Sequence, residues 1–209
     1  MRVRALPVVI ALAMGCAALD PASAQDPRFD TRLDAPTRAA IFAIIDSARA
    51  LGIAVEPLKE RVYEGVARGA DGPRIVAAVR SLSVEMASAH AALGTVASTD
   101  EIKAATSAMH AGVPVVELGK IKKQSGLRRS LTLPFTVLAD IVSRGVPVRT
   151  AANAIRSLLG AGARDADINK FQRDVQVDIE QGAPPGAVVE TRAKGAVPTK
   201  PDSGRPDDQ

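Results

Sequence analysis

The chain has 209 residues, of which 46% are hydrophobic, 24% charged and 2% aromatic, and its formal net charge is +4. A single cysteine excludes an internal disulfide, and the mild positive charge neither requires nor excludes an anionic partner. The length is sufficient for one domain that buries about 70% of the surface of the unfolded chain.

The first residues have the layout of a signal peptide. Basic residues precede an apolar run from Ala5 to Leu19, and Ala22-Ser23-Ala24 supplies the small residues of a cleavage site. We therefore expect residues 1–24 to be removed, leaving residues 25–34 as a polar tether. A membrane anchor is the alternative, but the apolar run is shorter than the roughly 20 residues that a spanning helix needs. Lipidation of Cys16 is a second alternative, although the residues before it match a lipobox poorly.

From residue 35 onward, apolar side chains recur at intervals of three and four residues, which predicts helices rather than strands. The first helix begins at a cap formed by Asp34 or Thr37 and ends at Gly52. The second runs from Pro57 to Gly69. The third opens at Asp71-Gly72-Pro73 and extends to Gly94, which makes it the longest. Ser98 and Glu101 have the spacing of a capping box, so a fourth helix begins there.

The second half of the chain continues the helical pattern. A short fifth helix is predicted from Val116 to Lys123, interrupted by Gly119. The sixth begins between Ser130 and Pro134, because proline is tolerated only near a helix start. The seventh contains Ile155, the eighth contains Phe171, and a short helical turn from Ala187 to Arg192 follows.

The predicted helical domain spans residues 35–193. Residues 194–209 are rich in Pro, Gly, Lys and Asp and carry Val197 as their one large apolar side chain. Such a composition cannot offset the entropy of ordering, which predicts a disordered tail. Phe42, Phe135 and Phe171 are expected to be the large buried anchors of the domain.

Three short segments predict corners between helices. Gly145-Val146-Pro147-Val148 recurs in degraded form at residues 112–115 and 52–55. Glycine can adopt the left-handed conformation that closes a helix, and proline two residues later suits the start of the next. The segment from Gly145 also aligns without gaps on the segment from Gly52, 93 residues earlier. We therefore predict an all-α fold, either a helical repeat or a bundle, of about eight short helices.

The corner at residues 145–148, together with Val188-Val189 after Pro184-Pro185, resembles secreted bacterial helical proteins. The resemblance implies no activity and no site residues. We expect an exported, non-enzymatic interaction or structural module of the bacterial cell envelope, periplasmic or secreted, whose partner is a protein or an anionic envelope polymer.

No motif of catalysis or of cofactor binding is found. His90 and His110 are the only histidines, and without cysteine they are too few for a typical zinc site. The sequence contains no Gly-x-Ser-x-Gly elbow, no Ser-x-x-Lys pair and no phosphate-binding P-loop. We therefore expect neither a metal nor a cofactor.

A basic stretch is the one electrostatic feature that suggests a binding site. No acidic residue lies between Glu117 and Asp140, whereas five basic residues crowd this interval: Lys120, Lys122, Lys123, Arg128 and Arg129. Such a patch is suited to phosphates or carboxylates. The preferred alternative is a solvated loop whose charges keep the chain soluble. No aromatic side chain is interleaved, so sequence-specific nucleic-acid binding is not expected.

Overall fold

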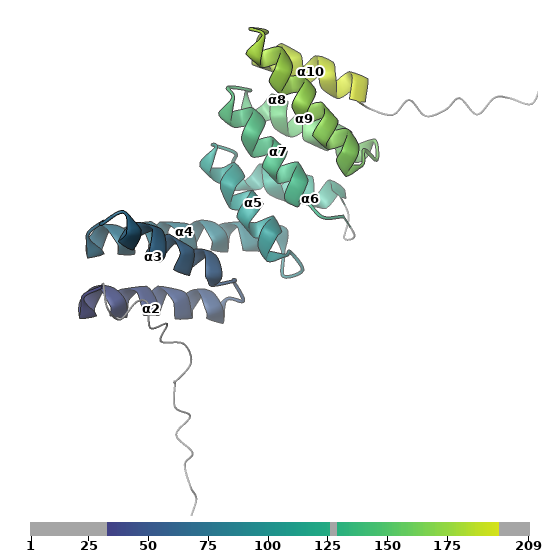
Figure 1. The fold of residues 1–209 in the computed structure, drawn as a ribbon. Coiled ribbons are helices and arrows are strands. Elements are labelled where there is room, and N and C mark those ends of the chain that lie inside the picture. Colours follow the sequence, from purple (N-terminus) through teal and green to yellow (C-terminus); the bar gives the residue numbers. More distant parts are fainter. Residues whose placement is uncertain (1–32, 126–128, 197–209) are drawn as a thin grey trace, which may run out of the picture.

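The computed structural model describes residues 33–125 and 129–196, and within these ranges the chain forms nine α-helices and no strand (Figure 1). The predicted all-α fold is therefore confirmed. The predicted signal peptide with Cys16, most of the predicted tether and residues 197–209 of the predicted tail lie outside the described residues.

The helices follow one another with short connections. Their bounds are α2 Ala35–Ala50, α3 Glu56–Ala67, α4 Gly72–Leu93, α5 Thr99–His110, α6 Val115–Ser125, α7 Thr132–Ser143, α8 Val148–Gly160, α9 Asp165–Glu180 and α10 Pro185–Ala196. As predicted, α4 is the longest, with 22 residues.

Two helices differ from the prediction. α6 continues through Gly119 without interruption, because the buried Leu118 and Ile121 on either side offset the roughly 1 kcal/mol that a glycine costs inside a helix. α10 is a helix of 12 residues rather than a short turn, and it ends at Ala196, beyond the predicted start of the tail at residue 194. Its buried Val188 and Val189 hold it against the helices beneath.

The predicted caps have the expected hydrogen bonds. Asp34, rather than Thr37, caps α2, since its Oδ1 accepts the Thr37 amide at 2.9 Å. Hydrogen bonds from Thr37 also hold the pKa of the Asp34 carboxyl below its ordinary value. At α5 the capping box is complete: the Glu101 amide donates to Ser98 Oγ at 3.1 Å, and the Ser98 amide donates to Glu101 Oε2 at 2.9 Å.

The corner at Gly145 shows why glycine is needed there. Its φ is 89°, in the left-handed region, and its amide donates to Val142 O at 2.9 Å. The amide of the buried Val146 donates to Ile141 O at 3.1 Å, so two otherwise unpaired carbonyls of α7 are satisfied and an apolar contact closes the turn. The other two predicted corners, at Gly52 and Gly112, have the same hydrogen-bond pattern.

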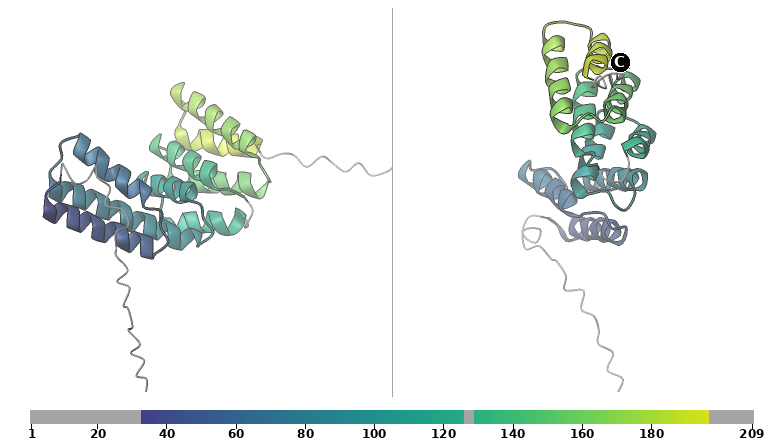
Figure 2. Two further views of the ribbon diagram at one scale, coloured as in Figure 1. Left: turned by 60° about the horizontal axis from the view of Figure 1, so that its bottom comes forward. Right: turned by 90° about the vertical axis from the view of Figure 1, so that its right-hand side faces the viewer.

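The helices pack in two rows. α2, α4, α6, α8 and α10 lie one after another in the first row, α5, α7 and α9 lie in the second, and α3 packs on α4 (Figures 1 and 2). The described part of the chain is therefore an extended stack of helices rather than a closed bundle. The extensive contacts join helices that are near neighbours, as in repeat proteins.

The row arrangement corrects the predicted repeat. Corners at Gly112, Gly145 and Gly182 recur roughly every 35 residues and lead from the second row to the first, in the size range of known helical repeats. The corner at Gly52 leads from the first row to α3, in the opposite direction. The ungapped alignment therefore superimposes helices of different rows, because a corner specifies a reversal of the chain and not the row that the next helix joins.

The core is continuous along the stack, but only two of the three predicted anchors are buried. Phe135 in α7 and Phe171 in α9 are 0% and 1% exposed. Phe42 is only partly buried. It lies in α2, which packs mainly on α4 and buries Ile41, Ile45 and Ala48 there.

An ion pair fixes α10 on α9. Arg192 Nε and Nη2 donate to the two carboxylate oxygens of Asp178, each at 2.7 Å. These hydrogen bonds lower the pKa of Asp178 below its ordinary value and raise the pKa of Arg192. The contact is therefore at full strength above the ordinary carboxyl pKa and is lost as the pH falls through the lowered pKa.

Candidate functional site

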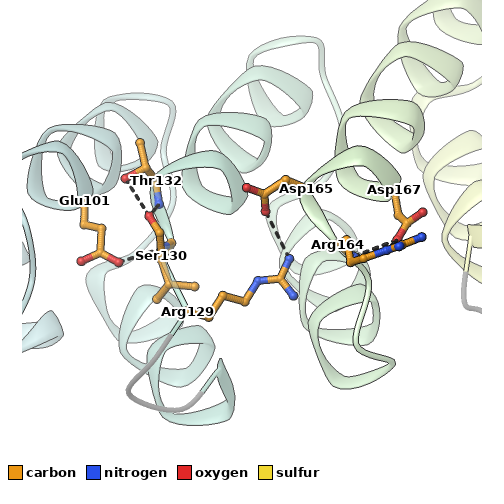
Figure 3. Close-up of polar contacts among 8 residues, drawn as sticks. Glu101, Arg129, Ser130, Thr132, Arg164, Asp165 and Asp167 are labelled. Atoms are coloured by element: carbon orange, nitrogen blue, oxygen red, sulfur yellow. Dashed lines mark hydrogen bonds and ion pairs between the residues drawn. The ribbon is translucent and has the colours of Figure 1, made fainter.

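The structure does not gather the predicted basic stretch into one site. Lys120 Nζ lies 2.6 Å from Glu117 Oε1 within α6. Arg129 Nη2 lies 3.5 Å from Asp165 Oδ1 at the start of α9 (Figure 3). Lys122 and Lys123 end α6 without an ion pair to any described residue, and Arg128 lies outside the described residues. The positive charges of Lys120 and Arg129 are therefore partly neutralised by Glu117 and Asp165.

The segment after the basic stretch has a structural role (Figure 3). Glu101 is 6% exposed, and its Oε1 accepts the buried amide of Leu131 at 2.7 Å, while its Oε2 accepts the Ser98 amide. One carboxylate thus holds the start of α5 and the start of α7 together. The sequence predicted the cap but not the contact with Leu131, which no local pattern indicates.

A cleft lies between α3 and α5. α5 packs directly on α7, and α7 on α9, whereas α3 and α5 both pack on α4 and meet in an ion pair between Glu60 and Lys103. The space between them has a volume of about 310 Å³, and we call it the α3–α5 cleft. Its floor is formed by Leu82 and Met86 of α4, and Met86 is 1% exposed. The floor is therefore part of the apolar core.

The two walls of the α3–α5 cleft have the same spacing. α3 contributes Pro57, Glu60, Arg61 and Glu64. α5 contributes Lys103, Thr106, Ser107 and His110. Each set falls at i, i+3, i+4 and i+7, which is one face of a helix over two turns. At 1.5 Å per residue the lined length is about 10 Å.

The polar groups of the cleft are engaged in pairs. Lys103 Nζ lies 3.7 Å from Glu60 Oε2 across the cleft, and Arg61 Nη1 lies 3.3 Å from Glu64 Oε2 along α3. His110 pairs with Glu85 of α4.

The two hydroxyl groups on the α5 wall are also engaged. Thr106 donates to Ile102 O at 2.9 Å and Ser107 to Lys103 O at 3.1 Å. Nucleophilic catalysis needs a hydroxyl or thiol within reach of an adjacent base. Among the described residues that line the cleft, neither hydroxyl is hydrogen-bonded to a histidine or a carboxylate. Neither hydroxyl is therefore activated by an adjacent base in this structure.

A second hollow, of about 350 Å³, lies between α8 and α10. It is lined by Thr150, Asn153, Ala154 and Ser157 of α8 and by Glu190, Ala193 and Lys194 of α10. Its walls come from two helices only, and no large apolar side chain forms its floor. The α3–α5 cleft, with three helices and a buried floor, is the better candidate for a binding site.

Comparison with protein-family models, with curated proteins and with solved structures finds no match for this chain. Over the described ranges, no helix combines the length and apolarity that crossing a bilayer requires. Within the same ranges, no three His, Cys, Asp or Glu side chains are grouped so that they could hold a metal ion.

Proposed function

We propose that the protein is a non-enzymatic interaction module that binds a segment of a partner polypeptide in the α3–α5 cleft. The supporting observation is the cleft itself: α3 and α5 both pack on α4 and leave a space of about 310 Å³ between them, above the partly buried Leu82 and the buried Met86, whereas α5, α7 and α9 pack directly on one another. Concave sites are typical of ligand binding, and stacked helices present extended surfaces to partners. Seven of the ten residues that line this cleft are polar or charged.

This role is preferred to anion binding. Lys120 and Arg129 of the basic stretch already have acidic partners, and only Lys122 and Lys123 are left without one among the described residues. The walls of the α3–α5 cleft, in contrast, carry both charges and surround an apolar floor, which suits a polypeptide better than a phosphate.

Blocking the cleft tests the proposal. In Ser107→Trp, an indole on the α5 wall fills the space, so peptides selected from a displayed random library on the wild-type protein should bind about tenfold more weakly or not at all. The matched control is Ser47→Trp on α2. Ser47 and Ser107 are both exposed serines that donate to the carbonyl four residues earlier, and Ser47 does not line the cleft.

Both variants should keep the helical circular dichroism spectrum of the wild type, because both positions are exposed. Peptides that bind Ser107→Trp as tightly as the wild type would contradict the proposal. Equal losses of peptide binding in Ser47→Trp and Ser107→Trp would also contradict it.

We further propose that the module acts in the periplasm or outside the cell. The support is the basic, apolar and small-residue layout of residues 1–24. Expressed as the full chain in a bacterial host, the protein should be recovered outside the cytoplasm with Gln25 at its N-terminus, as measured by mass spectrometry. A chain that keeps Met1 and stays in the cytoplasm, or one that carries lipid on Cys16, would contradict cleavage after Ala24.

A further inference from the structure

The charges of the α3–α5 cleft are divided between its walls. The α3 wall carries Glu60 and Glu64, whose side chains are 62% and 50% exposed, and its one cation, Arg61, pairs with Glu64. The α5 wall carries Lys103, 47% exposed, and His110, which pairs with Glu85 of α4, so Lys103 is the cation that this wall offers to a partner. A partner thus meets excess negative charge on one side of the apolar floor and positive charge on the other.

The ion pair between the walls leaves the cleft accessible. Glu60 and Lys103 are both exposed and are 3.7 Å apart, and exposed pairs of this kind contribute little to stability. A partner that offers a cation to Glu60 and a carboxylate to Lys103 therefore replaces one weak contact by two.

The walls are suited to a helix rather than to an extended strand. An extended segment needs donors and acceptors for its own backbone, but the hydroxyls of Thr106 and Ser107 already donate within α5. A helix satisfies its backbone internally. It can lie over the cleft and place apolar side chains spaced at i, i+3 or i+4, and i+7 against the partly buried Leu82, next to the buried Met86.

Resting on the proposed function, we propose that the α3–α5 cleft binds an amphipathic helix with basic side chains on the flank facing α3 and acidic side chains on the flank facing α5. Electrostatic complementarity of this kind selects a partner and fixes its orientation. The apolar face of the helix covers the floor, and its two flanks distinguish the walls.

A charge exchange tests this assignment. The double variant Glu60→Lys/Lys103→Glu keeps an ion pair across the cleft but reverses its polarity. The probe is a displayed library of helical peptides with a fixed leucine face and flanks that vary between Lys and Glu. The wild type should enrich peptides with Lys on one flank and Glu on the other. The double variant should bind these peptides about tenfold more weakly and enrich the reversed arrangement.

Two further variants sharpen the test. Asp46→Arg/Arg49→Asp exchanges a comparable exposed pair on α2, away from the cleft, and should leave the selected peptides unchanged. Lys103→Ala should remove the preference for an acidic flank and keep the preference for a basic one. This single change remains informative if the double variant does not fold.

The outcomes separate the two proposals. If the wild type and the double variant enrich the same peptides, and Ser107→Trp abolishes binding to both, the charge assignment is wrong and the binding role stands. If no selected peptide depends on Ser107, both proposals fail. If the wild-type protein dimerises in sedimentation experiments and Ser107→Trp is monomeric, the occupant is a second copy of the chain, and the helix assignment is overturned.

Discussion

Truncation of Phe135 to alanine is expected to lower the free energy of unfolding by about 3–5 kcal/mol. Phe135 is 0% exposed and lies in α7, which packs on α5, α8 and α9 in the middle of the stack. The variant loses the apolar contacts of the ring and leaves a cavity that these helices can close only in part. Denaturant unfolding followed by circular dichroism measures the loss.

Phe42→Ala is the control for this prediction. The same side chain is removed, but Phe42 is only partly buried against the core, so less area returns to water than for Phe135. Its cost should be clearly smaller than that of Phe135→Ala. If both variants lowered the free energy of unfolding equally, burial would not determine how much each phenylalanine ring contributes to stability.

Replacement of Glu101 by alanine is expected to cost about 2–4 kcal/mol, an unusually large effect for a helix-cap residue. The change removes half of the capping box of α5 and also leaves the buried amide of Leu131 without its acceptor. Cap loss contributes about 1 kcal/mol and the orphaned amide about 1–3 kcal/mol. Denaturant unfolding of the variant at neutral pH measures the sum.

Ser98→Ala separates the two contributions. It removes the hydroxyl that caps the Glu101 amide but keeps the contact between Glu101 and Leu131, so it should cost only about 1 kcal/mol. If Ser98→Ala and Glu101→Ala were equally destabilising, the contact between α5 and α7 would contribute nothing to stability.

The features that could be predicted from the sequence are those whose interactions are local. The cap at Asp34, the capping box at Ser98 and the corner at Gly145 each involve hydrogen bonds within five residues along the chain. Their residue types at fixed spacing are therefore visible as short patterns. These patterns predict how many helices form, and they place the helix ends to within a few residues.

The features that could not be predicted depend on where distant helices meet. The contact of Glu101 with Leu131 and the pairing of Arg129 with Asp165 join segments about 30 to 40 residues apart, and no periodicity specifies them. The α3–α5 cleft has the same origin. Its one sequence signal is the unusual length of α4. With 22 residues, α4 has room for both α3 and α5, of 12 residues each, to pack on it.

The neighbour-to-neighbour packing of the two rows has a mechanical consequence. In a stack whose extensive contacts join nearby helices, tension applied along its length is carried mainly from one interface to the next. Under tension, the described helices are therefore expected to separate interface by interface rather than all at once. The weakest interface yields first, and the segments beyond it keep their shape.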